Sequence, residues 1–99
     1  MVSSIKSSGA VLRAAQKMHI DILFLQETHL LGQRLPFLAR LGFGPVYHSS
    51  FTRGSRGVAI LMTTRLRFQM EHVWHDRLGR YIGLTGTIQG TRISFLCVY

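Results

Sequence analysis

Glu27 is the residue whose type and position in this sequence best suit metal chemistry. It comes just after an apolar run at 22–25, and such a run, without alternating polar residues, predicts a strand buried on both faces. In α/β folds, ligand and metal groups lie at the C-terminal ends of such strands. A carboxylate there is a hard oxygen ligand for Mg²⁺, which takes one or two protein carboxylates and leaves its other positions to water and phosphate. Taken alone, Glu27 is better explained as an exposed loop glutamate or a helix cap than as a metal ligand.

The five histidines and the single cysteine do not predict a metal centre. His72 and His75 are three residues apart, which in a strand places them on opposite faces, so they cannot share a metal ion. The other histidines have no ligand spacing, and one cysteine excludes a zinc knuckle. We expect the histidines to be surface or hydrogen-bonded core residues.

The segment 52–57, Thr-Arg-Gly-Ser-Arg-Gly, has the composition of an anion-binding turn. Its glycines permit a tight backbone, and Arg53 and Arg56 offer contacts to phosphate. It is not a Walker loop, because the Lys-Ser/Thr ending is missing and a strand pattern follows. A plain hairpin turn is the alternative. Arg53 and Arg56 are therefore the candidate nucleic-acid-binding residues.

The charge of the chain points in the same direction. Twelve Lys and Arg stand against four Asp and Glu, which gives a formal charge of +8, and ten of the twelve are arginines. Once folded, arginine pairs spread along the second half could form a polyanion-binding face, or simply a solvated basic surface. Tyr47, Trp74 and Tyr81 could stack on bases, although aromatic residues in strands more often serve packing.

Size and composition limit the remaining possibilities. The chain has 99 residues, of which 46% are hydrophobic and 16% charged, as in a small globular domain or a piece of a larger one. No apolar stretch has the length of a membrane span or of a signal peptide, so no membrane partner is expected. One cysteine suits a reducing compartment. We expect a nuclear or cytoplasmic protein.

The order of the predicted elements indicates an α/β fold, a sandwich with a mixed sheet. Helices are expected at about 7–18 and 35–41, and strands at 22–25, 46–51, 58–63, 68–74, 80–88 and 91–99. Strands that are apolar on both faces must be covered on both. Two short helices cover one side only, and the sequence stops at Tyr99 within a strand pattern. We therefore expect part of the domain to be absent.

Four motifs in order along the chain carry a resemblance to a known family. Residues 21–28, Asp-Ile-Leu-Phe-Leu-Gln-Glu-Thr, resemble a motif of the endonuclease/exonuclease/phosphatase superfamily. The ordered set resembles the endonuclease domain of LINE-type retrotransposons and consists of Gln-Glu-Thr-His at 26–29, Ser-Arg-Gly-Val-Ala-Ile-Leu at 55–61, Gly-Arg-Tyr-Ile at 79–82 and Cys-Val-Tyr at 97–99.

This resemblance implies a four-layer α/β sandwich, of which the chain would be roughly the first half, and a metal-dependent hydrolysis of DNA phosphodiesters. It implies that Glu27 is the metal-binding and catalytic carboxylate, that the metal is Mg²⁺ with no small-molecule cofactor, and that Tyr99 is the active-site tyrosine beside the scissile phosphate. A phenol there would donate a hydrogen bond to phosphate or position a carboxylate.

The chain also departs from the family pattern. The Asn-Val-Asn-Gly, Gly-Asp-Phe-Asn and Ser-Asp-His segments, which supply the other site residues, have no counterpart in it. Of its other acidic residues, Asp21, Glu71 and Asp76 match no site position, and Asp21 begins the strand at the end opposite Glu27. We therefore expect a truncated domain over 1–99, without its first strand and C-terminal half, that is inactive as an isolated chain.

Two other functional interpretations remain open at this point. The chain could be a small basic nucleic-acid-binding module without catalysis, because +8 of charge gives salt-sensitive phosphate binding in any case. It could also be a retroelement remnant without function, which would aggregate through an uncovered apolar sheet face. Binding to nucleic acid without Mg²⁺-dependent cleavage would favour the module.

Overall fold

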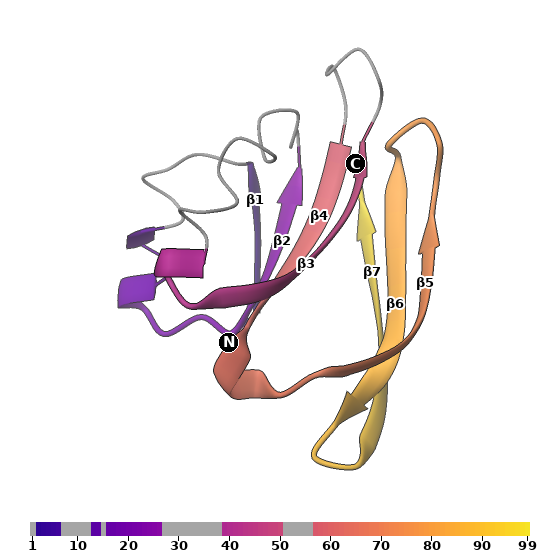
Figure 1. Ribbon diagram of the computed structural model, residues 1–99. Helices are drawn as coiled ribbons and strands as arrows, with labels where there is room; N and C mark the ends of the chain where they lie inside the picture. The colour runs from indigo at the N-terminus through magenta and orange to yellow at the C-terminus, as the bar shows by residue number, and fades with distance from the viewer. Residues whose placement is uncertain (1, 7–12, 15, 27–38, 51–56) are drawn as a thin grey trace.

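The computed structural model describes residues 2–6, 13–14, 16–26, 39–50 and 57–99. Seven strands and one 3₁₀ turn make up the ordered elements of these ranges (Figure 1): β1 (Val2–Lys6), β2 (Ile22–Gln26), β3 (Phe43–Ser50), β4 (Gly57–Thr63), η2 (Thr64–Leu66), β5 (Gln69–His75), β6 (Tyr81–Ile88) and β7 (Thr91–Val98). Strand β1 occupies residues to which the sequence analysis assigned no element.

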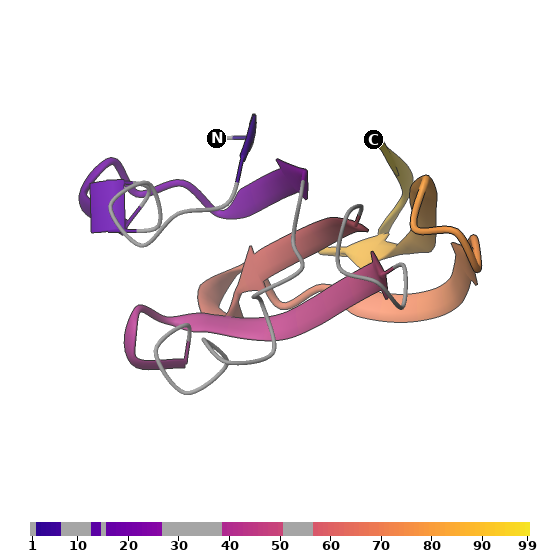
Figure 2. The same ribbon diagram turned by 90° about the horizontal axis from the view of Figure 1, so that it is seen from above.

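The strands form two separate sheets (Figure 2). The first sheet has the order β1-β2-β4-β3, with β1 parallel to β2 and the other pairs antiparallel. The second sheet is an antiparallel meander in the order β5-β6-β7. The expected hairpin around Gln89 and Gly90 is confirmed, and both residues have positive φ, 51° and 79°, as a tight hairpin turn requires.

The α/β class expected from the sequence, the partial four-layer sandwich included, is wrong for the described part of the chain, which is all-β. The only α-helical residues described are 13–14, 16–17 and 39–40. The rest of the two expected helices falls largely on 7–12 and 35–38, outside the described residues. The apolar runs at 22–25 and 58–63 predict strands covered on both faces, and the sequence analysis considers only helices as the cover, whereas another sheet can cover a face equally well.

The core between the two sheets supplies that cover. Every residue of β4 is buried, and its side chains alternate between the two faces of the first sheet. One set of these side chains packs against the second sheet. The prediction that nothing in the chain covers this face is therefore wrong. The cluster between the sheets consists of Ile22, Val58, Ile60, Met62, Ile82, Leu84 and Cys97.

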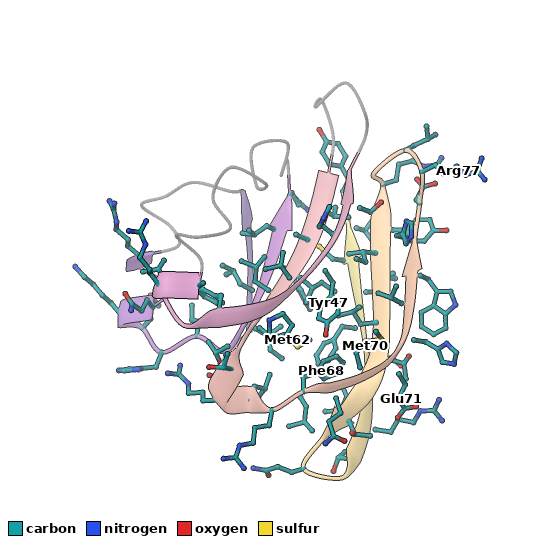
Figure 3. The ribbon with its side chains drawn as sticks, in the orientation of Figure 1. Tyr47, Met62, Phe68, Met70, Glu71 and Arg77 are labelled. Atoms are coloured by element: carbon teal, nitrogen blue, oxygen red, sulfur yellow. The ribbon has the colours of Figure 1, made fainter. Side chains whose placement is uncertain are left out.

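Aromatic rings pack against this cluster, and Figure 3 shows two of them, Tyr47 and Phe68, between the sheets. Phe68 packs edge-on against Tyr47 and Phe95, with ring centroids 6.2 and 5.9 Å apart, and Phe24 packs edge-on against Phe95 at 6.2 Å. Burial raises the pKa of the Tyr47 phenol. For Tyr47, packing rather than base stacking is therefore its observed role.

A second, smaller core lies on the opposite face of the first sheet. It contains Leu23, Leu25, Ala59 and Leu61 together with Ile20 and Phe43, and the half-buried Leu41 and Val46 pack against it. The central strands β2 and β4 are therefore buried on both faces, as their apolar runs predicted. Because both faces of β2 and β4 are packed, the ends of these two strands are held in fixed positions.

Candidate functional site

The C-terminal ends of β2 and β7 meet across the two sheets. The Gln26 side-chain amide nitrogen donates a hydrogen bond to the carbonyl of Val98 at 2.9 Å, although the two residues are 72 positions apart. One residue earlier in each strand, the thiol of Cys97 donates to the carbonyl of Leu25 at 3.6 Å. These two contacts join the C-terminal ends of β2 and β7 at the upper end of Figure 1, where the C-terminus lies.

The two residues that carried the family resemblance follow these strand ends in the sequence. Tyr99 comes directly after Val98; its side chain is 47% exposed, and its backbone N–H donates to the carbonyl of Arg80 at 2.7 Å. Glu27 comes directly after Gln26 and lies outside the described residues. The structure thus brings together the sequence neighbours of Glu27 and Tyr99, from different sheets.

The turn between β5 and β6, residues 76–80, is fastened to the same end of the molecule. The Ser49 hydroxyl donates to the carbonyl of Asp76, which ties the turn to β3 of the first sheet. The Asp76 carboxylate accepts hydrogen bonds from Arg80, through Nε at 2.5 Å and the backbone nitrogen at 3.3 Å. These bonds from Arg80 hold the pKa of the Asp76 carboxyl below its usual range.

Sequence reasoning gave Asp76 no place in a site. The signal was local: an aspartate three residues before Gly79, which has a φ of 69°, is typical of a tight turn whose carboxylate bonds the following backbone. The sequence does not predict that this turn lies beside Tyr99. Its carboxylate is already bonded to Arg80 and is not available as a second metal ligand in this arrangement.

The connection between β3 and β4 leaves from this end as well. In the first sheet Gln26 pairs with Val58, and Val58 pairs with Ser49. Residues 51–56, which include Arg53 and Arg56, join these strands but lie outside the described residues. The strand ends on either side of the predicted anion-binding turn are therefore next to the Gln26–Val98 contact.

Asp21 and Glu71 lie away from this end. Asp21 precedes β2 at its other end, as the sequence predicted, and accepts hydrogen bonds from the Thr63 hydroxyl at 2.8 Å and from Arg65 Nε at 2.5 Å. The bond from Thr63, assisted by Arg65, lowers the pKa of the Asp21 carboxyl. Glu71, in β5, forms an ion pair with Arg92 of β7 at 3.5 Å.

The described residues contain no group of three or more histidine, cysteine, aspartate and glutamate side chains that could hold a metal ion. The register places His72 beside Thr85 and His75 beside Ile82, so these two histidines face opposite sides of the second sheet, as predicted. Glu27 lies outside these residues. Mg²⁺ commonly takes only one or two protein carboxylates and completes its shell with water and phosphate oxygens.

Trp74 and Tyr81 have the exposure that base stacking requires, 53% and 40% respectively. They belong to the second sheet, on the face turned away from the first. The described residues include no helix with the length and apolar character needed to cross a bilayer. No protein-family model matches the chain.

Proposed function

We propose that this chain forms part of a Mg²⁺-dependent DNA endonuclease of the retrotransposon type, in which Glu27 binds the metal and Tyr99 lies beside the scissile phosphate. The supporting observation is the 2.9 Å hydrogen bond from Gln26 to Val98. A metal ligand and a phosphate donor from distant parts of a sequence form one site only if their strands end together. The hydrogen bond from Gln26 to Val98 meets this requirement, because it joins the ends of β2 and β7.

Each proposed role follows from the chemistry of the side chain. The Glu27 carboxylate supplies a hard oxygen ligand, and Mg²⁺, when bound there, would stabilise negative charge on phosphoryl oxygens. The Tyr99 hydroxyl would donate a hydrogen bond to a phosphate oxygen or hold a neighbouring carboxylate in place. The backbone bond from Tyr99 to Arg80 anchors the residue that carries this phenol.

The substrate class rests on charge. Arg53 and Arg56 are assigned to the DNA backbone, because arginine presents a planar donor fork that matches phosphate. Arg77, in the exposed turn that contacts this end, adds a further positive charge. A DNA substrate is consistent with a nuclear or cytoplasmic protein that uses no small-molecule cofactor.

The 99-residue chain by itself is expected to bind metal and DNA without nicking. Hydrolysis also needs a base and donors that orient the phosphate, and the sequence has no counterpart of the Gly-Asp-Phe-Asn and Ser-Asp-His segments. A non-catalytic nucleic-acid-binding module is the second candidate. It is supported by the described acidic side chains, Asp21, Glu71 and Asp76, all of which are in ion pairs with arginine.

The proposal is tested by the effect of Mg²⁺ on DNA affinity. At constant ionic strength, Mg²⁺ is expected to strengthen binding of the chain to a duplex relative to EDTA, because Glu27 would hold an ion whose positive charge would attract DNA phosphate. Glu27→Gln should abolish the gain. Glu71→Gln is the matched control, because it removes the same charge from an ion pair elsewhere on the molecule and should retain the gain.

One result would contradict the proposed metal site, and another would contradict the expected inactivity of the chain. A Mg²⁺ effect that is identical in the unaltered chain and in Glu27→Gln would remove the metal site and favour the non-catalytic module. Efficient Mg²⁺-dependent nicking of plasmid DNA by the 99-residue chain, abolished by Glu27→Ala, would show that the additional segments are not needed and would overturn the expected inactivity.

A further inference from the structure

The face of the second sheet that points away from the first sheet carries large exposed side chains. Trp74, Leu96 and Val98 are 53%, 64% and 53% exposed, which is unusual for apolar residues that adjoin one another across strands. We call this surface the outer face; it consists of His72, Trp74, Tyr81, Leu96 and Val98.

The strand register makes the outer face a continuous platform. Trp74 pairs with Gly83, which pairs with Leu96. A Cβ atom at Gly83 would lie 3.5 Å from Cε3 of Trp74 and 3.7 Å from Cδ1 of Leu96, so both side chains approach each other over the bare glycine backbone. Trp74 also stacks on the ring of His72, with centroids 5.6 Å apart and an angle of 25° between the rings.

The charges around the platform favour an anion. Glu71 and Asp76, the acidic residues nearest to it in sequence, are paired with Arg92 and Arg80, so neither presents uncompensated negative charge. Arg77 projects outward at the upper end of the second sheet, and Glu71, with Arg92 beside it, lies lower on the same side (Figure 3). The whole chain carries +8.

We propose that the outer face binds single-stranded DNA, with a base stacked against Trp74 and its backbone held by Arg77. Aromatic platforms beside basic side chains bind single strands because every base has a π-face and every nucleotide a phosphate. The bases of a duplex already stack on each other and cannot lie on this surface. The proposal does not rest on the metal site, which is at the strand ends rather than on this face.

DNA is preferred to RNA because of the polar groups at the centre of the sheet. The hydroxyls of Thr85 and Ser94, next to the platform, hydrogen-bond to each other at 2.8 Å. This bond engages one of the two hydroxyl protons, and Thr85 is only 6% exposed, so Thr85 offers little contact to a ribose 2′-hydroxyl, the group by which proteins recognise RNA. Leu96 and Val98 present only apolar groups, which suit deoxyribose.

The test uses Trp74 as its own probe, because it is the only tryptophan of the chain. Its fluorescence should be quenched saturably when an oligo-dT strand is titrated into the full chain, and less so as salt increases. The titration is done in EDTA, so that it reports on the outer face whether or not the metal site exists. Labelled-strand anisotropy should show that Trp74→Ala weakens binding by about 5-fold to 150-fold, the range of one stacked base.

Two further variants control for charge. Arg77→Gln and Lys17→Gln each remove one positive charge, and only Arg77 adjoins the second sheet, so only Arg77→Gln should weaken binding. Circular dichroism checks that Trp74→Ala remains folded, and His72→Ala provides a second, milder removal of the stack. Each of four results would overturn the proposal. The fluorescence could stay unchanged on adding the strand, or change with protein concentration alone. Trp74→Ala could bind as tightly as the unaltered chain, or oligo-U could bind as tightly as oligo-dT or more tightly.

Discussion

The two faces of the second sheet are built from alternate residues of the same strands, yet they differ in almost every property. The inner face contributes Ile82, Leu84 and Cys97, which are at most 3% exposed. The outer face contributes Trp74 and Leu96, which are more than half exposed. Over β6 and the end of β7 the inner face is covered by another sheet, whereas Val73 of β5, on the same face, is 39% exposed. The outer face is open at Trp74 and Leu96.

This difference separates the residues that fix the fold from those that are free to bind. A residue on the inner face contributes the free energy of apolar burial and close packing. A residue on the outer face contributes little to stability, so a large aromatic side chain kept there is better explained by what it contacts from outside. Matched substitutions on the two faces test this division.

The largest difference is expected between Leu84 and Leu96. Leu84→Ala removes a fully buried side chain and should lower the free energy of unfolding by about 2–5 kcal/mol. Leu96→Ala removes the same atoms from the outer face and should change it by about 0.5 kcal/mol or less. Urea denaturation of both variants measures the two values. Equal losses would show that the outer face is covered in solution.

Cys97 reports on the same division through its reactivity. Burial raises the pKa of its thiol to about 11 from 9.0, so at pH 8 the reactive thiolate is about 100-fold scarcer than in a free thiol, because each pKa unit is a factor of ten. Alkylation by iodoacetamide should be at least that much slower in the folded chain than in urea. Similar rates would indicate that the inner face opens readily.

Two glycines of β6 provide a smaller contrast. A Cβ atom at Gly86, on the inner face, would lie 2.3 Å from the carbonyl oxygen of Gln69 and 2.4 Å from the ring of Phe68, whereas one at Gly83 meets nothing closer than 3.5 Å. Gly86→Ala should therefore cost about 1–3 kcal/mol through overpacking. Gly83→Ala should be neutral or slightly stabilising. Thermal unfolding of the two variants measures this; a greater loss for Gly83→Ala would contradict the assigned faces.

The smallest effect concerns Asp76, in the turn beside the outer face. The bonds from Arg80 lower the pKa of its carboxyl in the folded state, so its contribution to stability is present above the unfolded pKa of about 3.9 and is lost as the pH falls through the lowered value. The melting temperature of the unaltered chain should exceed that of Asp76→Asn at pH 7. The difference should vanish in strong acid; a difference independent of pH would show that the charge is not involved.

Much of the fold was predictable where the sequence carries a local pattern. The apolar runs of β2 and β4 predicted strands buried on both faces, and Gln89-Gly90 predicted the hairpin between β6 and β7. The fold class was not predictable in this way, because a run such as Val58 to Met62 shows that a face is covered but not whether a helix or a sheet covers it. Strand β1 was missed because Val-Ser-Ser-Ile-Lys is short and half polar.

The candidate site was predictable only in part. The resemblance drew attention to Glu27 and Tyr99, and the packing of the two sheets brings together the positions before them, Gln26 and Val98. Asp76 and Arg80 could not be placed beside Tyr99 from sequence, since the contact depends on how two sheets pack. The outer face was equally hidden, because Trp74 lies in a strand whose residues are all exposed and the sequence gives no sign of which face of the second sheet is open.

The central claim, that β2 and β7 end at one metal site, is tested most directly by NMR with Mn²⁺ in place of Mg²⁺. Bound Mn²⁺ should selectively broaden the amide signals of Gln26, Val98 and Tyr99 and spare those of Asp21 and Arg65, which contact each other at the opposite end of β2, and Glu27→Gln should abolish the broadening. Uniform broadening, broadening centred elsewhere, or the same pattern in Glu27→Gln would contradict the claim.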